Sequence, residues 1–190
     1  MAYTSPEPIY DVPTRTNRTL LVLFLVGAAV SVALGVYGRL HTPTGISVNV
    51  SGFSGPREVK VWLASLAFVG ALIQLTTALM MYGKLPAILG GGVTAAVHRW
   101  SGRIAFLLTV PVAIHCLYAL GFQSFDTRTL IHSTLGCIFF GAFTVKMLIL
   151  SRDNMPGWAL PVFGGLVFTV LVGLWLTSSL WFFTAVGVRF

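Results

Sequence analysis

Two histidines, His115 and His132, stand inside apolar stretches and are the residues best suited to hold a metal cofactor. A short polar segment, residues 123–128, separates the two stretches. With a rise of about 1.5 Å per helical residue, His115 lies about 9 Å before Gly121, and His132 lies about 7.5 Å after Thr127. On neighbouring antiparallel helices, the two imidazoles are therefore predicted to lie at nearly the same depth.

Two histidines at one depth can bind a haem iron from both of its faces. Ionisable side chains within a bilayer are costly, and they mark function by default. An alternative is a polar contact, between two histidines or between a histidine and a serine, that joins two helices without any cofactor. A zinc or copper site would need more ligands than this depth provides.

The residues around the pair suit a flat macrocycle. Gly136 lies one turn from His132 on the same helix face, so a porphyrin could approach the backbone there. Tyr118, together with Phe139 and Phe140, is expected to supply aromatic walls. Apolar walls and a close backbone favour a bound haem b over a simple contact between helices.

Two arginines are expected at the membrane interface nearest to the histidine pair. Arg128 precedes His132, and Arg39 ends the first apolar stretch. Because haem propionates are anionic and turn toward water, a charge-assisted bond from Arg128 or Arg39 is predicted. Contact with lipid headgroups is the alternative for both.

The other two histidines have simpler interpretations. His41 follows the first apolar stretch in a polar loop, where a bond to a backbone carbonyl or contact with lipid headgroups is expected. His98 stands beside Arg99 and Trp100, a combination typical of the membrane interface. At about 100° per residue, His98 and His115 point to different faces of one helix, which disfavours two haems along one seam. Whether His98 holds a second cofactor stays open.

The composition predicts a protein embedded in a lipid bilayer. The 190 residues are 56% hydrophobic and 9% charged, and the mean hydropathy is +0.87. A soluble domain needs far less apolar sequence. The net charge of +7 is scattered over loops and helix ends, which favours lipid headgroups over nucleic acid as its partner.

The order of apolar stretches predicts an all-α, polytopic bundle of five transmembrane helices. A polar tail (residues 1–18) precedes one domain (residues 19–185), and residues 186–190 form a C-terminal tail. Apolar and polar residues alternate over residues 46–50, which allows a short strand there. Pro111 is expected to kink the third helix. The helices are expected over about residues 20–37, 59–82, 96–120, 130–150 and 158–183.

Five crossings would place the two ends of the chain on opposite sides of the membrane. With the N-terminus inside, seven of the 12 lysines and arginines fall on the inner side, which weakly favours that orientation. The expected location is the bacterial plasma membrane, with the N-terminus cytoplasmic and the C-terminus outside. The histidine pair then lies near the outer face.

Three stretches resemble a family of small uncharacterised bacterial membrane proteins common in actinobacteria. They are HRWSGRIAFLLTVPVAIHCLYALGF, LIHSTLGCIFFGAFTVKMLIL and GWALPVFGGLVFTVLVGLWLTSSLWFF. More distantly, they are similar to ferric-reductase-like and other membrane b-type cytochrome domains. The resemblance implies that His115 is a haem ligand and His132 its partner. Ferric-reductase-type domains commonly carry two ligands on one helix, and this chain lacks that pair.

The expected function is therefore that of a membrane b-type cytochrome with one non-covalent, bis-histidine haem. It would transfer electrons within or beside a respiratory chain, to a redox partner protein or a quinone. A bis-histidine iron has no open position, which favours an electron carrier over a stand-alone enzyme. Two alternatives stay open: a cofactor-free subunit of a larger respiratory complex, and a small quinone-linked or metal reductase subunit.

Overall fold

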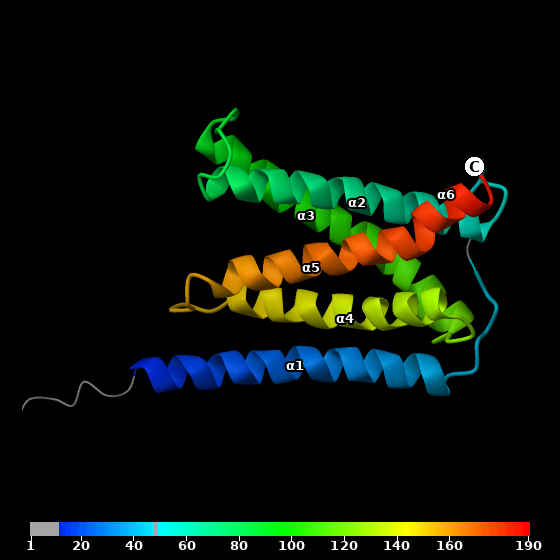
Figure 1. The fold of residues 1–190 in the computed structure, drawn as a ribbon, viewed down its shortest axis with the longest axis horizontal. Helices are drawn as coiled ribbons and strands as arrows, with labels where there is room; N and C mark the ends of the chain where they lie inside the picture. The colour runs from blue at the N-terminus through cyan, green and yellow to red at the C-terminus, as the bar shows by residue number, and fades with distance from the viewer. Residues whose placement is uncertain (1–11, 48) are drawn as a thin grey trace, which may run out of the picture.

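The structure, a computed structural model, describes residues 12–47 and 49–190, and these residues form helices and no strand (Figure 1). Five helical rods are long and apolar enough to cross a membrane, so the predicted all-α fold is confirmed. The helices are α1 (Val12–Leu40), α2 (Pro56–Met81), α3 (Gly91–Ile114), α4 (Thr127–Leu150), α5 (Ala159–Trp175) and α6 (Trp181–Ala185). Two π-helical segments complete the rods: η1 (His115–Leu120) continues α3, and η2 (Leu176–Leu180) joins α5 to α6.

The start of the first helix and the structure of residues 46–50 differ from the prediction. α1 begins at Val12, inside the segment expected to be an irregular tail, and Pro13 falls in its first turn. A proline is compatible with that position, because the first N–H groups of a helix have no helical partner. Residues 1–11 of the tail lie outside the described residues. The strand considered for residues 46–50 does not form in the part of that segment that the structure describes.

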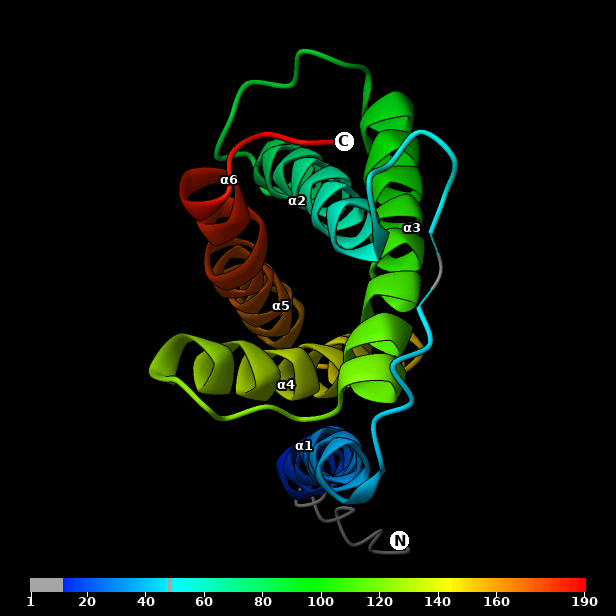
Figure 2. The same cartoon turned by 90° about the vertical axis from the view of Figure 1, so that its right-hand side faces the viewer.

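The rods alternate in direction, so α1 begins at one end of the bundle and the chain finishes at the other (Figure 1). α3 packs along α2, whereas α4 packs between α1 and α5 (Figure 2). α3 and α4 were expected to be direct neighbours, yet the main partner of α3 is α2. They approach each other through side chains, as where Phe106 stacks on Phe143 with 3.9 Å between ring centroids.

Glycines set the contact between α1 and α4. A Cβ added to Gly141 would lie 2.3 Å from the carbonyl oxygen of Gly27 and 2.1 Å from Ser31 Oγ. A Cβ on Gly27 would likewise lie 2.7 Å from the carbonyl oxygen of Gly141. Small residues that let backbones approach this closely are typical of helix pairs in membranes.

The loop after α1 holds the end of η1. The backbone N–H groups of Thr44 and Gly45 donate to the carbonyls of Tyr118 and Ala119, at 3.2 and 3.1 Å. Gly121 follows with φ +73°, and a Cβ there would lie 2.9 Å from the carbonyl oxygen of Gly38. Only glycine meets both demands without strain. The end of α3 is thereby attached to the end of α1.

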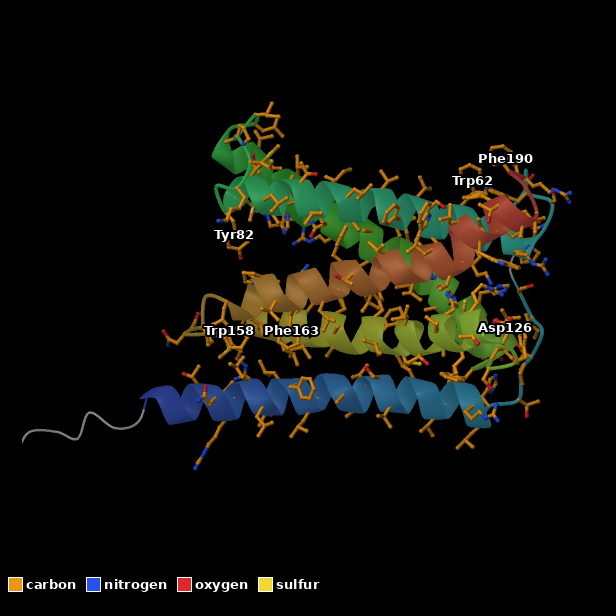
Figure 3. The ribbon with its side chains drawn as sticks, in the orientation of Figure 1. Trp62, Tyr82, Asp126, Trp158, Phe163 and Phe190 are labelled. Carbon is orange, nitrogen blue, oxygen red and sulfur yellow. The ribbon has the colours of Figure 1, made fainter. Side chains whose placement is uncertain are left out.

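Aromatic residues mark both ends of the bundle (Figure 3). Trp62 and Phe190 lie at the same end as Asp126, with their rings stacked 4.8 Å apart. Tyr82 and Trp158 lie at the opposite end. Tryptophan and tyrosine concentrate where a membrane meets water, so this distribution suits a rod arrangement that crosses the bilayer.

Candidate functional site

A cavity of about 640 Å³ opens among α2, α3, α4 and the rod made of α5, η2 and α6. Its size is that of a site for a cofactor or another small molecule. Most of its wall is apolar, and it includes Cys116 and Cys137. Its charged, imidazole and hydroxyl side chains include Arg57, Lys60, Arg128, His132, Ser133 and Thr177.

His132 is held by a short relay of hydrogen bonds. The Thr177 hydroxyl lies 2.7 Å from the Gly173 carbonyl and donates its proton there. Thr177 Oγ1 therefore accepts from the His132 ring, whose Nδ1 is 3.0 Å away. This fixes the proton on Nδ1 and leaves the lone pair on Nε2. The ring also interacts with the backbone of Leu174, and His132 is one of the residues that line the cavity.

Arg128 lies on the same helix as His132 and contacts several neighbouring residues. One guanidinium nitrogen donates to the Thr177 carbonyl at 2.8 Å, and the group lies 3.8 Å from the ring centre of Trp181. A second nitrogen is 3.9 Å from the Asp126 carboxylate. Arg128 thus belongs to the cavity wall with its charge already compensated.

Asp126 supplies that compensation and also starts α4. Its carboxylate accepts hydrogen bonds from the Thr129 N–H at 2.7 Å and from the Thr129 hydroxyl at 2.9 Å. The bond from the Thr129 N–H lowers the pKa of Asp126 below its ordinary value of 3.8, and the charge of Arg128 lowers it further. The carboxylate is therefore ionised at neutral pH, as a helix N-cap favours.

The two π-helical segments both border the cavity. η1 contributes Cys116, Leu117 and Leu120, and η2 contributes Thr177 and Ser178. A π-helical turn pairs residues five apart and frequently occurs at functional sites. In η2, the carbonyl of Thr177 accepts its bond from Arg128, and its hydroxyl serves His132.

The inner end of the cavity is aromatic. Phe139 and Phe140 line it, as predicted, and Phe140 meets Phe106 of α3 edge to face at 6.1 Å. Gly136 also lines the cavity, and a Cβ placed there would meet nothing within 4 Å. Of the residues predicted to surround the cofactor, Phe139, Phe140 and Gly136 of α4 thus line the cavity.

Three predicted site residues lie elsewhere. His115 is half-buried at the start of η1, and this rod lines the cavity instead with Val112 of α3 and with Cys116 and Leu120 of η1, among others. Tyr118 stacks on His41 with 5.2 Å between ring centres. Arg39 is exposed at the end of α1. The structure thus brings His132, Arg128 and Gly136 together but does not place His115, Tyr118 or Arg39 in this wall.

The other two histidines are hydrogen-bonded within the bundle. Nε2 of His41 lies 3.0 Å from the Tyr118 carbonyl, the helix-end contact that was expected. Nδ1 of His98 lies 2.9 Å from the hydroxyl of Thr77, at the end of the bundle away from the cavity. Neither residue contributes to the cavity wall.

Two important residues of the wall were missed from the sequence. Thr177 sits 45 positions after His132, and Lys60 was assigned only to contact with headgroups. A threonine on the fifth helix, at the depth of the histidines, was the available signal for Thr177. Lys60 shares an i, i+3, i+4, i+7 face with Arg57, Val61 and Ala64, a pattern that marks one side of a helix.

A family comparison matches residues 20–190, and the chain belongs to the family described as "Family of unknown function (DUF6529)". Neither the curated proteins nor the solved structures gave a match. The match supports the expected resemblance to a family without assigned function. It carries no information on haem or on b-type cytochromes.

Proposed function

For this member of the DUF6529 family, we propose a membrane b-type cytochrome that holds one haem b in the cavity. The observation that carries the proposal is the His132 ring, which lines the cavity and whose Nδ1 is held by Thr177. Metal-binding histidines typically hold their second ring nitrogen in such a bond. Bound haem supplies one-electron chemistry, and the chain would transfer electrons within or beside a respiratory chain.

The cavity suits this group in three respects. Its wall is mostly apolar, Gly136 leaves the backbone open, and phenylalanines close the inner end. His132 would bind the iron, and His115 is the proposed second ligand from the neighbouring rod. Because His115 is not part of the cavity wall in the described chain, its role rests on the sequence pattern alone.

The proposed location is the bacterial plasma membrane, with α1 beginning on the cytoplasmic side. The cavity lies at the opposite end of the bundle, so the haem would exchange electrons near the outer face, with a redox partner protein or a quinone. A membrane-impermeant reductant should then reduce the haem quickly in right-side-out vesicles and slowly in inverted ones. The reverse preference would invert the orientation.

Haem content in a set of histidine variants tests the proposal. His132→Ala should purify without haem, because the variant loses the imidazole that the cavity presents. His115→Ala should also lose it if that residue is the second ligand, whereas His41→Ala should retain it. Acid acetone should extract the pigment, since nothing attaches it covalently. Full haem content in the His115→Ala/His132→Ala double variant would refute the site.

The main alternative is a cofactor-free subunit of a larger respiratory complex. The small size of the chain and its short loops favour this alternative. Such a subunit would purify colourless with every histidine intact. A small quinone-linked or metal reductase would instead carry pigment and turn over an added acceptor. The colour of the purified protein and its turnover of an added acceptor together distinguish the cytochrome, the cofactor-free subunit and the reductase.

A further inference from the structure

Lys60 places a positive charge in the wall of a mostly apolar cavity. It lies on the side of α2 that also presents Arg57, Val61 and Ala64 to the cavity. Its side chain is half-buried. Hydrogen bonds anchor this part of α2, because Ser65 and Ser179 both donate to the carbonyl of Val61, at 2.9 and 3.0 Å. The position of Lys60 in the wall is therefore set by the helix packing.

Among the residues that the structure describes, the charge of Lys60 has no ion-pair partner. In the described residues, Lys60 and Arg57 form no ion pair and no hydrogen bond through their side chains. Arg128, across the cavity, is different, because Asp126, the Thr177 carbonyl and Trp181 surround its guanidinium group. A half-buried charge beside apolar surface is costly unless an opposite charge joins it.

We infer that Lys60, assisted by Arg57, binds a carboxylate group of the ligand in the cavity. The site would therefore bind a planar, apolar molecule more tightly when that molecule carries a carboxylate at one edge. The inference rests on the proposed function for the identity of the ligand, a porphyrin diacid. It differs from the predicted propionate partners: Arg39 is outside the wall, and Arg128 already donates to the Thr177 carbonyl.

The placement of the cations fits such a ligand. Arg57 and Lys60 lie in the first turns of α2, whose first turn is at the same end of the bundle as the end of the chain (Figure 1). Phe139 and Phe140 lie about two turns further along α4 than His132. A ligand with acid groups at one edge and an apolar body would pair its charges at the mouth and bury its rings against the phenylalanines.

Iron-free protoporphyrin IX tests this anchor without any iron ligation. Protein expressed under haem limitation would be titrated with the diacid and with its dimethyl ester, and binding followed by porphyrin fluorescence. The wild type should bind the diacid about 10-fold or more tightly than the ester. Lys60→Gln/Arg57→Gln should reduce that preference to about two-fold or less, whereas Lys60→Arg/Arg57→Lys should keep it. The matched control is Lys84→Gln, which removes an exposed lysine at the other end of the bundle and should change nothing.

The outcomes separate this inference from the proposed function. Equal affinity of the wild type for diacid and ester, or an unchanged preference in Lys60→Gln/Arg57→Gln, would overturn the carboxylate anchor. His132→Ala should keep the preference for the iron-free diacid over its ester. Loss of this preference in His132→Ala would also count against an anchor at Lys60. If His132→Ala instead retained its full haem content, His132 would not be the iron ligand, whereas the carboxylate anchor at Lys60 would be unaffected.

Discussion

Thr177 holds two residues of the cavity through two different atoms. Its hydroxyl oxygen accepts from His132 Nδ1, and its carbonyl accepts from Arg128. The valine side chain has nearly the same shape as threonine but cannot accept the imidazole bond. We predict that Thr177→Val lowers haem affinity about 10- to 100-fold, whereas Thr177→Ser restores most of it.

Haem titration of the two variants measures this difference. The thermal midpoint of the haem-free protein separates positioning from general stability, because Thr177 also bonds within its own helix. Equal haem affinity in Thr177→Val and wild type would show that the relay does not position His132.

Asp126 gives a prediction about pH. Its folded-state pKa lies below the ordinary value of 3.8, so its ionised form stabilises the fold. That contribution is complete above the unfolded-state pKa and is lost as the pH falls through the lower folded-state pKa. In detergent, the thermal midpoint of the wild type should therefore fall more steeply below about pH 4 than that of Asp126→Asn. Identical slopes would contradict the role of the carboxylate as a charged cap.

The sequence identified His132, Arg128 and Gly136 because each carries a local signal. A histidine in an apolar helix, an arginine at its first turn and a glycine one turn away are visible in one segment. Thr177 and Lys60 act through contacts between different rods, and their local sequence is ordinary for a membrane helix. The depth of His115 was counted as if the following residues formed a regular α-helix, but they form η1, whose turn is wider.

At the level of the helices, glycine positions on α4 divide into two kinds. A Cβ on Gly141 would collide with the backbone of α1, whereas one on Gly136 would meet open space. We predict that Gly141→Ala destabilises the bundle by about 1–3 kcal/mol through overpacking. Gly136→Ala serves as the control on the same helix and should not destabilise it, because alanine favours the helical state.

Reversible unfolding in mixed micelles would measure both variants. If Gly136→Ala lowered the free energy of unfolding as much as Gly141→Ala, the close contact between α1 and α4 would not be the cause of the destabilisation.

The helices themselves were predictable, and their π-helical segments were not. Each apolar run is long enough to cross a hydrocarbon core, which fixed the number and approximate place of the rods. Pro111 signalled an irregularity, and η1 begins four residues later. No comparable signal precedes η2 within α5, whose only proline stands near its start. A π-helical turn depends on which carbonyls find partners on other rods, and a single helix does not encode that choice.

For the whole molecule, the order of packing decides where the cavity lies. Sequence neighbours α3 and α4 were expected to pack directly, but α3 packs on α2 and α4 on α1 and α5. The small residues Gly70 and Ala105 explain the first pair, since a Cβ on Gly70 would lie 2.9 Å from that of Ala105. The cavity is therefore enclosed by side chains of α2, α3, α4 and the rod made of α5, η2 and α6.

The odd number of rods also predicts where labels on the two ends will be found. A reporter active only in the cytoplasm should work at one end of the chain and fail at the other, and in the proposed orientation it works before α1 and fails after Phe190. Activity at both ends would require an even number of crossings and would contradict the five rods seen here.

The central claim is that the cavity beside His132 holds haem b. A reduced-minus-oxidised absorption spectrum of the purified wild-type protein, with haem quantified per chain, tests it most directly. We predict the bands of a b-type cytochrome and one haem per chain. A colourless protein from haem-replete cells, folded by its thermal transition, would contradict the claim.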